Sequence, residues 1–401
     1  MIICDFFASS ISLNKCKKTT VNMLLIIDLK PQKILKSLDF LQNHWKFFGI
    51  KFAPILMPIE DRICTLVIFI WTHTILFLAL FTTIVMIYML ILTKYWWIAL
   101  AYCAWVLFDK DTMNKGGRSG WLRERMRNWV FWKYFVRYFP IRLVKTANLE
   151  TNKNYVIGSH PHGICSAGAF GAFATEGAGF GANYPGISPY LHTLDMNCLG
   201  PLHREWILGL GCCSSSKKSI SHVLSRPGGA ASVLVVGGAA ESIYSEEGRL
   251  RLVLKNRKGF IKLAMRHGAD LGKAILLFVF INLLHLLSVP SFSFGETGIY
   301  SQVSNLTGSF LRVFQDSVKQ LTGVIPCLFK GRGFFQYSFG LMPLSNPITV
   351  VVGHPIKVIK NENPTNEEIH ALHMSYMEEL YQLYEAHKSK YGQKHINIEF
   401  V

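Results

Sequence analysis

Two apolar runs stand near the N-terminus. Residues 63–92 carry no Asp, Glu, Lys or Arg, and a second apolar run covers residues 96–108. The first exceeds the roughly 20 residues that a membrane-spanning helix needs, whereas the second, at about 1.5 Å per residue, reaches only about 20 Å. The pattern predicts a tail over residues 1–62 and a membrane-embedded helical hairpin over residues 63–109, with a shallow second arm. A buried helix of a soluble core fits less well, because such helices rarely run this long without polar residues. A cleaved signal peptide would lie closer to the N-terminus and be shorter.

Beyond Lys145, short β-branched runs alternate with glycine-marked turns. The clearest run covers residues 232–236 and leads into Gly237-Gly238-Ala239-Ala240-Glu241, and similar runs cover residues 324–329 and 348–352. This alternation predicts an α/β domain with a mixed sheet over residues 110–401. Thr365, with Glu368 three residues later, forms a capping box that starts a C-terminal amphipathic helix, for which a structural role is expected.

Composition and charge strengthen the membrane interpretation. Half of the residues are hydrophobic, only 17% are charged, and the net charge is +17. Basic residues flank the hairpin on both sides, so the positive-inside rule places both ends in the cytosol. Six tryptophans are spaced like interfacial anchors: Trp96, Trp97, Trp105, Trp121, Trp129 and Trp132. Nucleic-acid binding is excluded, because the chain has no zinc finger, basic zipper or RNP-like pattern.

Several catalytic classes are excluded by inspection. The chain has no G-x-S-x-G motif, no Walker loop and no strand-linked G-x-G-x-x-G, which disfavours serine hydrolases, nucleoside triphosphatases and dinucleotide enzymes. No histidine is followed by Asp five residues later, as in His-x4-Asp acyltransferases. The nine cysteines lack metal-binding or disulfide-framework spacing, so free thiols and no metal site are expected.

The candidate chemistry lies in a histidine turn. His160 and His162 flank Pro161 and precede Gly163, between a strand-like segment and a small-residue segment that predicts a helix. A junction of this kind can direct an imidazole and free backbone amides at one substrate atom. The alternative is a Pro/Gly turn whose histidines bind neighbouring backbone groups.

Glu241 also follows a predicted strand, and functional groups in α/β sheets collect where strands end. We therefore expect Glu241 to share a crevice with the histidine turn, where it orients an imidazole and stabilises the protonated form. A helix N-terminal carboxylate that meets the helix dipole is the alternative.

From about Phe52 to the C-terminus, the chain resembles the monoacylglycerol and type-2 diacylglycerol acyltransferase family. The motifs that carry the resemblance are Tyr138-Phe139-Pro140, His160-Pro161-His162-Gly163, Pro185-Gly186-Ile187, Gly237-Gly238-Ala239-Ala240-Glu241, Asn256-Arg257-Lys258-Gly259-Phe260, Phe292-Ser293-Phe294-Gly295-Glu296 and Gly331-Arg332-Gly333. The resemblance implies an integral enzyme of the endoplasmic reticulum and lipid droplets. Such an enzyme moves a fatty acyl group from acyl-CoA, its co-substrate, to an acylglycerol and needs no cofactor.

Within this chemistry, His162 is the preferred general base and His160 its rival, and Glu241 holds the imidazole. Amides near Gly163 stabilise the developing oxyanion. Arg257, Lys258 and Lys262 either bind the phosphates of CoA or form a basic helix face toward solvent and headgroups.

The acceptor stays open between monoacylglycerol, diacylglycerol, a long-chain alcohol and retinol. A catalytically silent lipid-droplet protein held by its hairpin is the rival in another class, and a membrane hydrolase is disfavoured by the missing nucleophile. The expected partners are acyl-CoA, mono- or diacylglycerol and the lipid bilayer or droplet monolayer, and a homo-oligomer stays open.

Two segments depart from the family. Residues 272–288 form an apolar insertion that is too short for a comfortable membrane span. We interpret it as a retained short intron or a gene-model error, which sequencing the transcript would test. Residues 1–50 have no recognised counterpart in the family.

Overall fold

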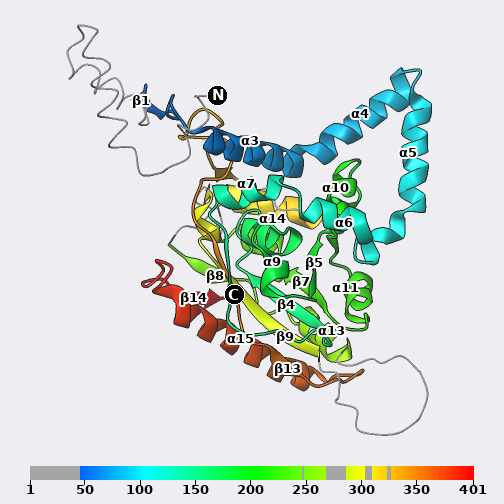
Figure 1. Cartoon of the computed structure of the whole chain (residues 1–401), viewed down its shortest axis with the longest axis vertical. Coiled ribbons are helices and arrows are strands. Elements are labelled where there is room, and N and C mark those ends of the chain that lie inside the picture. The colour runs from blue at the N-terminus through cyan, green and yellow to red at the C-terminus, as the bar shows by residue number, and fades with distance from the viewer. Residues whose placement is uncertain (1–45, 246–247, 268–285, 303–308, 323–326) are drawn as a thin grey trace, which may run out of the picture.

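The computed structural model describes residues 46–245, 248–267, 286–302, 309–322 and 327–401 (Figure 1). The predicted insertion therefore falls mostly outside the described residues, as does most of the N-terminal tail. The last three residues of that insertion, 286–288, belong to a described strand and pair within the central sheet. They are therefore part of the domain.

The helical elements are α3 (Ile59–His73), η2 (Thr74–Leu78), α4 (Ala79–Leu92), α5 (Trp96–Phe108), η3 (Lys110–Asn114), α6 (Gly120–Arg127), α7 (Phe131–Tyr138), α8 (Ala167–Ala169), η4 (Phe170–Ala174), α9 (Phe180–Asn183), η5 (Asp195–Cys198), α10 (His203–Gly209), α11 (Lys217–Leu224), α12 (Ala239–Ser242), α13 (Gly259–His267), η6 (Glu296–Gly298), α14 (Phe310–Thr322) and α15 (Asn366–Lys388). The strands are β1 (Lys46–Phe47), β2 (Ile50–Lys51), β3 (Arg142–Lys145), β4 (Tyr155–His160), β5 (Ser188–Thr193), β6 (Cys213–Ser214), β7 (Ala230–Val235), β8 (Leu250–Leu252), β9 (Leu286–Phe294), β10 (Ser301–Gln302), β11 (Phe329–Lys330), β12 (Thr349–Val352), β13 (Ile356–Val358) and β14 (Ile398–Phe400).

An eight-stranded mixed sheet forms the centre of the described domain, which confirms the predicted α/β class. Its order is β3-β12-β9-β4-β7-β5-β6, with β13 paired to β9. Strands β9, β4, β7, β5 and β6 are parallel to one another, whereas β12 runs antiparallel to β9. The carboxyl ends of β9, β4 and β7 therefore lie side by side at one edge of the sheet.

Helices cover both faces of this sheet, because its central strands are apolar on both sides. In β4, Tyr155 and Ile157 face a core that includes residues of α3, α7 and η4, while Val156 faces a second core with α11, α13 and α15. Figure 1 shows α15 along the opposite side of the sheet from α3. The predicted capping box at the start of α15 is present: the Thr365 hydroxyl accepts from Glu368 N, and Glu368 accepts from Thr365 N.

The apolar run over residues 63–92 is divided between two environments. It belongs to one helical stretch, Ile59–Leu92, which is long and apolar enough to cross a membrane. Its first part, α3, packs against α7, and Val67, Ile68 and Trp71 are buried in the main core. After the π-helical turn η2, α4 leaves the domain and turns back into α5 (Figure 1). The inner face of α3 is therefore part of the domain core, and the membrane hairpin over residues 63–109 stays a prediction.

A buried ion cluster fixes the base of α5 to the domain. Asp109 follows α5 and accepts from Arg118 Nη1 and Arg204 Nη2, both at 2.7 Å. Glu205 accepts from the same two arginines and from Trp105 Nε1 of α5. Because Arg204 is only 1% exposed, the α4–α5 pair is held to the domain by charges that are poorly screened by water.

Candidate functional site

The histidine turn lies at the carboxyl edge of the three central parallel strands. It follows β4, the Gly237–Gly238 turn and α12 follow β7, and Glu296 follows β9. Strands β9 and β7 are the two neighbours of β4. The sheet therefore brings together three loops that are far apart in the sequence, as expected for functional groups in α/β folds.

His162 has one ring nitrogen bound and the other free. Its Nδ1 lies 3.0 Å from Gly163 O and 3.1 Å from Ser242 Oγ. Because a carbonyl oxygen only accepts, Nδ1 carries the proton and Nε2 carries the lone pair. Among the described residues, Nε2 has no hydrogen-bond partner. Desolvation lowers the pKa of His162, and the hydrogen bond to Gly163 O offsets part of this shift. The ring is therefore neutral at neutral pH.

His160 lies in a different environment. It is fully buried, and its Nε2 lies 3.1 Å from the hydroxyl of Tyr376 on α15. That hydroxyl donates to Gly158 O at 3.1 Å, so His160 Nε2–H donates to it in turn. The buried Nδ1 of His160 has no partner among the described residues. Burial lowers the pKa of His160 to about 3, which makes it a poor proton acceptor.

Glu241 contacts the histidine turn through the backbone. Its Oε1 accepts from the His162 backbone N–H at 2.5 Å, and its Oε2 accepts from Val253 N at 2.9 Å. The expected hydrogen bond to an imidazole is therefore not the one that forms: Ser242, the next residue, contacts the ring instead. Glu241 is 2% exposed, and burial raises its pKa to about 7. Its position fixes the path of the chain that carries His162.

Glu296 is a second buried carboxyl group, and it braces the other side of the turn. Its two oxygens accept from Ala167 N and Gly168 N, both at 2.7 Å. Burial raises its pKa to about 7. These two amides are therefore occupied and do not face a substrate. Glu296 was not predicted as a site residue, although Phe294-Gly295-Glu296 ends a strand as the Glu241 segment does.

Gly163 meets Glu296 at close range. Its φ is +59°, and a Cβ there would lie 2.8 Å from Glu296 Cγ, so this position accepts only glycine. The amide N–H of Gly163 has no hydrogen-bond partner among the described residues.

The predicted basic residues lie before and within α13. Arg257 and Lys258 precede this helix and Lys262 is in its first turn, and none of the three forms an ion pair among the described residues. Lys258 Nζ lies 3.3 Å from His370 Nδ1 of α15. The charge of Arg257 lowers the pKa of Glu241 against the effect of burial, so this basic group lies near the histidine turn.

Comparison with known proteins decides the family. The family model described as diacylglycerol acyltransferase matches residues 88–400. The chain belongs to the diacylglycerol acyltransferase family. It is 43% identical to 2-acylglycerol O-acyltransferase 1 of Bos taurus over 86% of this chain and 96% of that protein. It is also 43% identical to diacylglycerol O-acyltransferase 2 of Mus musculus, over 83% of this chain and 81% of the relative. No solved structure matches.

For this member of the diacylglycerol acyltransferase family, the described residues hold no group of three His, Cys, Asp or Glu arranged to bind a metal ion. All seven described cysteines are free.

Proposed function

We propose that this member of the diacylglycerol acyltransferase family transfers a fatty acyl group from acyl-CoA to the free hydroxyl of an acylglycerol, with His162 as the general base. The observation that carries the proposal is the free Nε2 of His162 beside a fixed, proton-bearing Nδ1. Such an imidazole is oriented, uncharged and ready to accept a proton. No cofactor beyond the acyl-CoA co-substrate enters the scheme.

The reaction balances with the groups at the turn. His162 Nε2 takes the proton of the acceptor hydroxyl while the oxygen of that hydroxyl attacks the carbonyl carbon of the thioester. The Gly163 N–H donates to the oxyanion that forms. One such donor typically lowers the activation free energy by about 2.7–4 kcal/mol. The C–S bond then breaks, and the imidazolium returns its proton to the departing CoA thiolate. Glu241 and Glu296 act as positioning residues that hold the two sides of the turn.

Arg257, Lys258 and Lys262 bind the phosphates of CoA in this proposal. They lie at the start of α13, where helix amides also favour anions, and the charge of Arg257 acts on Glu241 beside the turn. His160 is excluded as the base in this scheme because it is buried, hydrogen-bonded to Tyr376 and shifted to a low pKa.

The α4–α5 pair forms the membrane anchor in this proposal. Each helix exposes large apolar side chains along its length, including Phe81 and Ile91 of α4 and Trp97 and Phe108 of α5. Because α4 and α5 are each about 20 Å long, they enter a bilayer or droplet monolayer as a hairpin with both ends cytosolic. The endoplasmic reticulum and lipid droplets are the proposed locations.

The test is expression in yeast that lacks neutral-lipid synthesis, with labelled oleoyl-CoA and each candidate acceptor in turn. We expect labelled di- or triacylglycerol from the wild type, none from His162→Ala, and wild-type levels from His395→Ala, an exposed histidine outside the site. Expressing the chain with and without residues 272–285 separates an inhibitory insertion from an inactive domain. Stable membrane expression without product in either form would favour the silent droplet protein. Product only with a long-chain alcohol or retinol would redefine the acceptor.

A further inference from the structure

Helix α6 directs its arginines to two different sides. Arg123 Nη2 donates to Pro189 O and its guanidinium stacks on Tyr190, and Arg127 pairs with Glu176. These two arginines anchor α6 to the domain. Arg125 lies between them in sequence but faces outward, and among the described residues it forms no ion pair. Its guanidinium carbon lies 5.6 Å from the centre of the Trp121 ring, in a cation–π contact.

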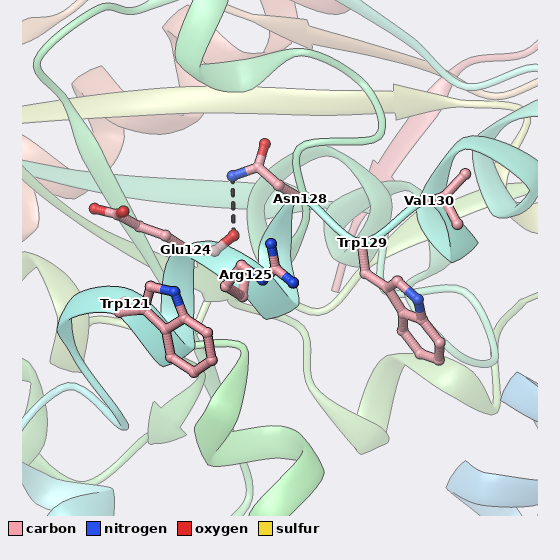
Figure 2. A pocket seen from close by; sticks show the side chains of 6 residues that line it. All are labelled: Trp121, Glu124, Arg125, Asn128, Trp129 and Val130. Carbon is pink, nitrogen blue, oxygen red and sulfur yellow. Dashed lines mark hydrogen bonds between the residues drawn. The ribbon is translucent and has the colours of Figure 1, made fainter.

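Arg125 lies in a groove between two exposed indoles. Trp121, Arg125 and Trp129 recur every four residues, which places them on one side of the helix and its C-terminal turn. The groove has a volume of about 470 Å³ and is lined by these three residues with Glu124, Asn128 and Val130 (Figure 2). In Figure 2 the Glu124 carboxylate points away from the Arg125 guanidinium, and the Asn128 amide donates to Glu124 O. The charge of Arg125 is therefore left for a ligand.

We propose that this groove binds the phosphate of a bilayer phospholipid, and this rests on the membrane placement proposed above. A guanidinium donates paired hydrogen bonds to a phosphate, and indoles favour the boundary between headgroups and acyl chains. Trp121 is 70% exposed and Trp129 is 52% exposed, whereas Trp132 of the adjoining helix α7 is 1% exposed. A phospholipid supplies both the phosphate for Arg125 and, in its acyl chains, an apolar neighbour for the indoles.

The helix that carries the groove is linked to the anchor through α10. Helix α10 contacts both α6 and η2, the turn from which α4 leaves the domain. Figure 1 places α6 between α7 and the lower end of α5. A phospholipid held here would add a second attachment point beside the α4–α5 pair and so set the tilt of the domain at the interface.

The test uses the full chain reconstituted in phosphatidylcholine vesicles that contain a small fraction of a photoactivatable lipid. One probe is a phosphatidylcholine with a headgroup diazirine, and the matched probe is a diacylglycerol of the same chains, which lacks the phosphate. Adducts are mapped by mass spectrometry. We expect the phospholipid probe to label residues 119–130, and Arg125→Gln to lower that labelling about tenfold, the usual effect of one hydrogen-bonded charge. Trp121→Leu, which keeps apolar area but removes the indole, should also lower it.

Lys133→Gln is the matched control, because it removes one exposed charge from the adjoining helix α7 and should leave labelling of the groove unchanged. Equal labelling of the wild type and Arg125→Gln, or equal labelling by the diacylglycerol probe, would overturn the proposal. An acyl-chain diazirine must label α4 in every sample, and its failure would overturn the membrane placement on which the groove depends. Acyl transfer by the wild type in the same vesicles separates the two proposals, since an active sample without headgroup labelling refutes only the groove.

Discussion

The hydroxyl of Tyr376 lies between His160 and the backbone of Gly158, accepting from His160 Nε2 and donating to Gly158 O, both at 3.1 Å. It occupies the space where a Cβ on Gly158 would stand. The C-terminal helix therefore reaches the strand that carries the histidine turn. The structural role expected of this helix therefore includes fixing the orientation of His160.

Tyr376→Phe should lower kcat about tenfold and leave KM for acyl-CoA unchanged. Removing the hydroxyl takes away the partner that His160 N–H and Gly158 O share, which costs about 1–3 kcal/mol of folding free energy. The histidine turn would still form, but it would be held less precisely. Steady-state kinetics of the purified variant measure kcat and KM separately. Tyr381→Phe is the control, because Tyr381 is a more exposed tyrosine of α15. A rise in KM at constant kcat would instead place Tyr376 in substrate binding.

Gly158→Ala should be more damaging than Tyr376→Phe, and the two changes should not be additive. The new methyl group collides with the Tyr376 hydroxyl, whereas the double variant removes that hydroxyl and relieves most of the collision. Thermal unfolding in detergent should therefore give a double variant that is more stable than Gly158→Ala alone. Strict additivity would show that the two side chains do not touch.

The acid limb of the pH–rate profile should lie below pH 6.5. Desolvation lowers the pKa of His162 from its ordinary value, so the neutral base persists to lower pH and activity falls only as the ring is finally protonated. The pH dependence of kcat/KM measures this limb. A limb well above pH 6.5 would mean that a nearby negative charge stabilises the imidazolium.

The contribution of Glu296 to stability should fall as the pH rises from about 5 to about 8, because burial raises its pKa to about 7 in the folded state. A carboxyl group whose folded pKa is raised binds its proton more tightly when folded, so its stabilisation is complete below the unfolded pKa and is lost as pH rises through the folded one. Glu296→Gln should remove its share of this slope, leaving that of Glu241. Thermal unfolding across this pH range tests it, and an unchanged slope in the variant would contradict it.

Trp71→Ala should destabilise the domain by about 3–5 kcal/mol, the usual cost of emptying a large buried site. The indole is 1% exposed and packs edge-on against Phe135. Phe81→Ala in α4 is the matched control, since that ring is 63% exposed and should matter little to folding of the domain. Thermal unfolding of both variants in detergent compares their stabilities. Equal effects would mean that α3, like α4, belongs to the membrane anchor and not to the domain core.

Burial separates residues that look alike in the sequence. Trp121, Trp129 and Trp132 were all predicted as interfacial anchors, yet Trp132 is 1% exposed and its Nε1 donates to Met126 O, so that prediction is wrong for Trp132 alone. The three residues share a sequence neighbourhood of alternating aromatics and cations. Only the packing of α7 against the core decides which indole faces outward.

By itself, the sequence determined the α/β class, the long apolar segment, the capping box and the importance of the histidine turn. Each of these depends on residues that are close in the chain, so periodicity and spacing suffice. The tertiary structure decided that Tyr376 binds His160, that Glu241 holds a backbone amide, and that Glu296 braces the same turn. These are contacts between segments up to 216 residues apart, as for His160 and Tyr376. Such contacts depend on strand register and on which helix covers each face, and local spacing does not encode either.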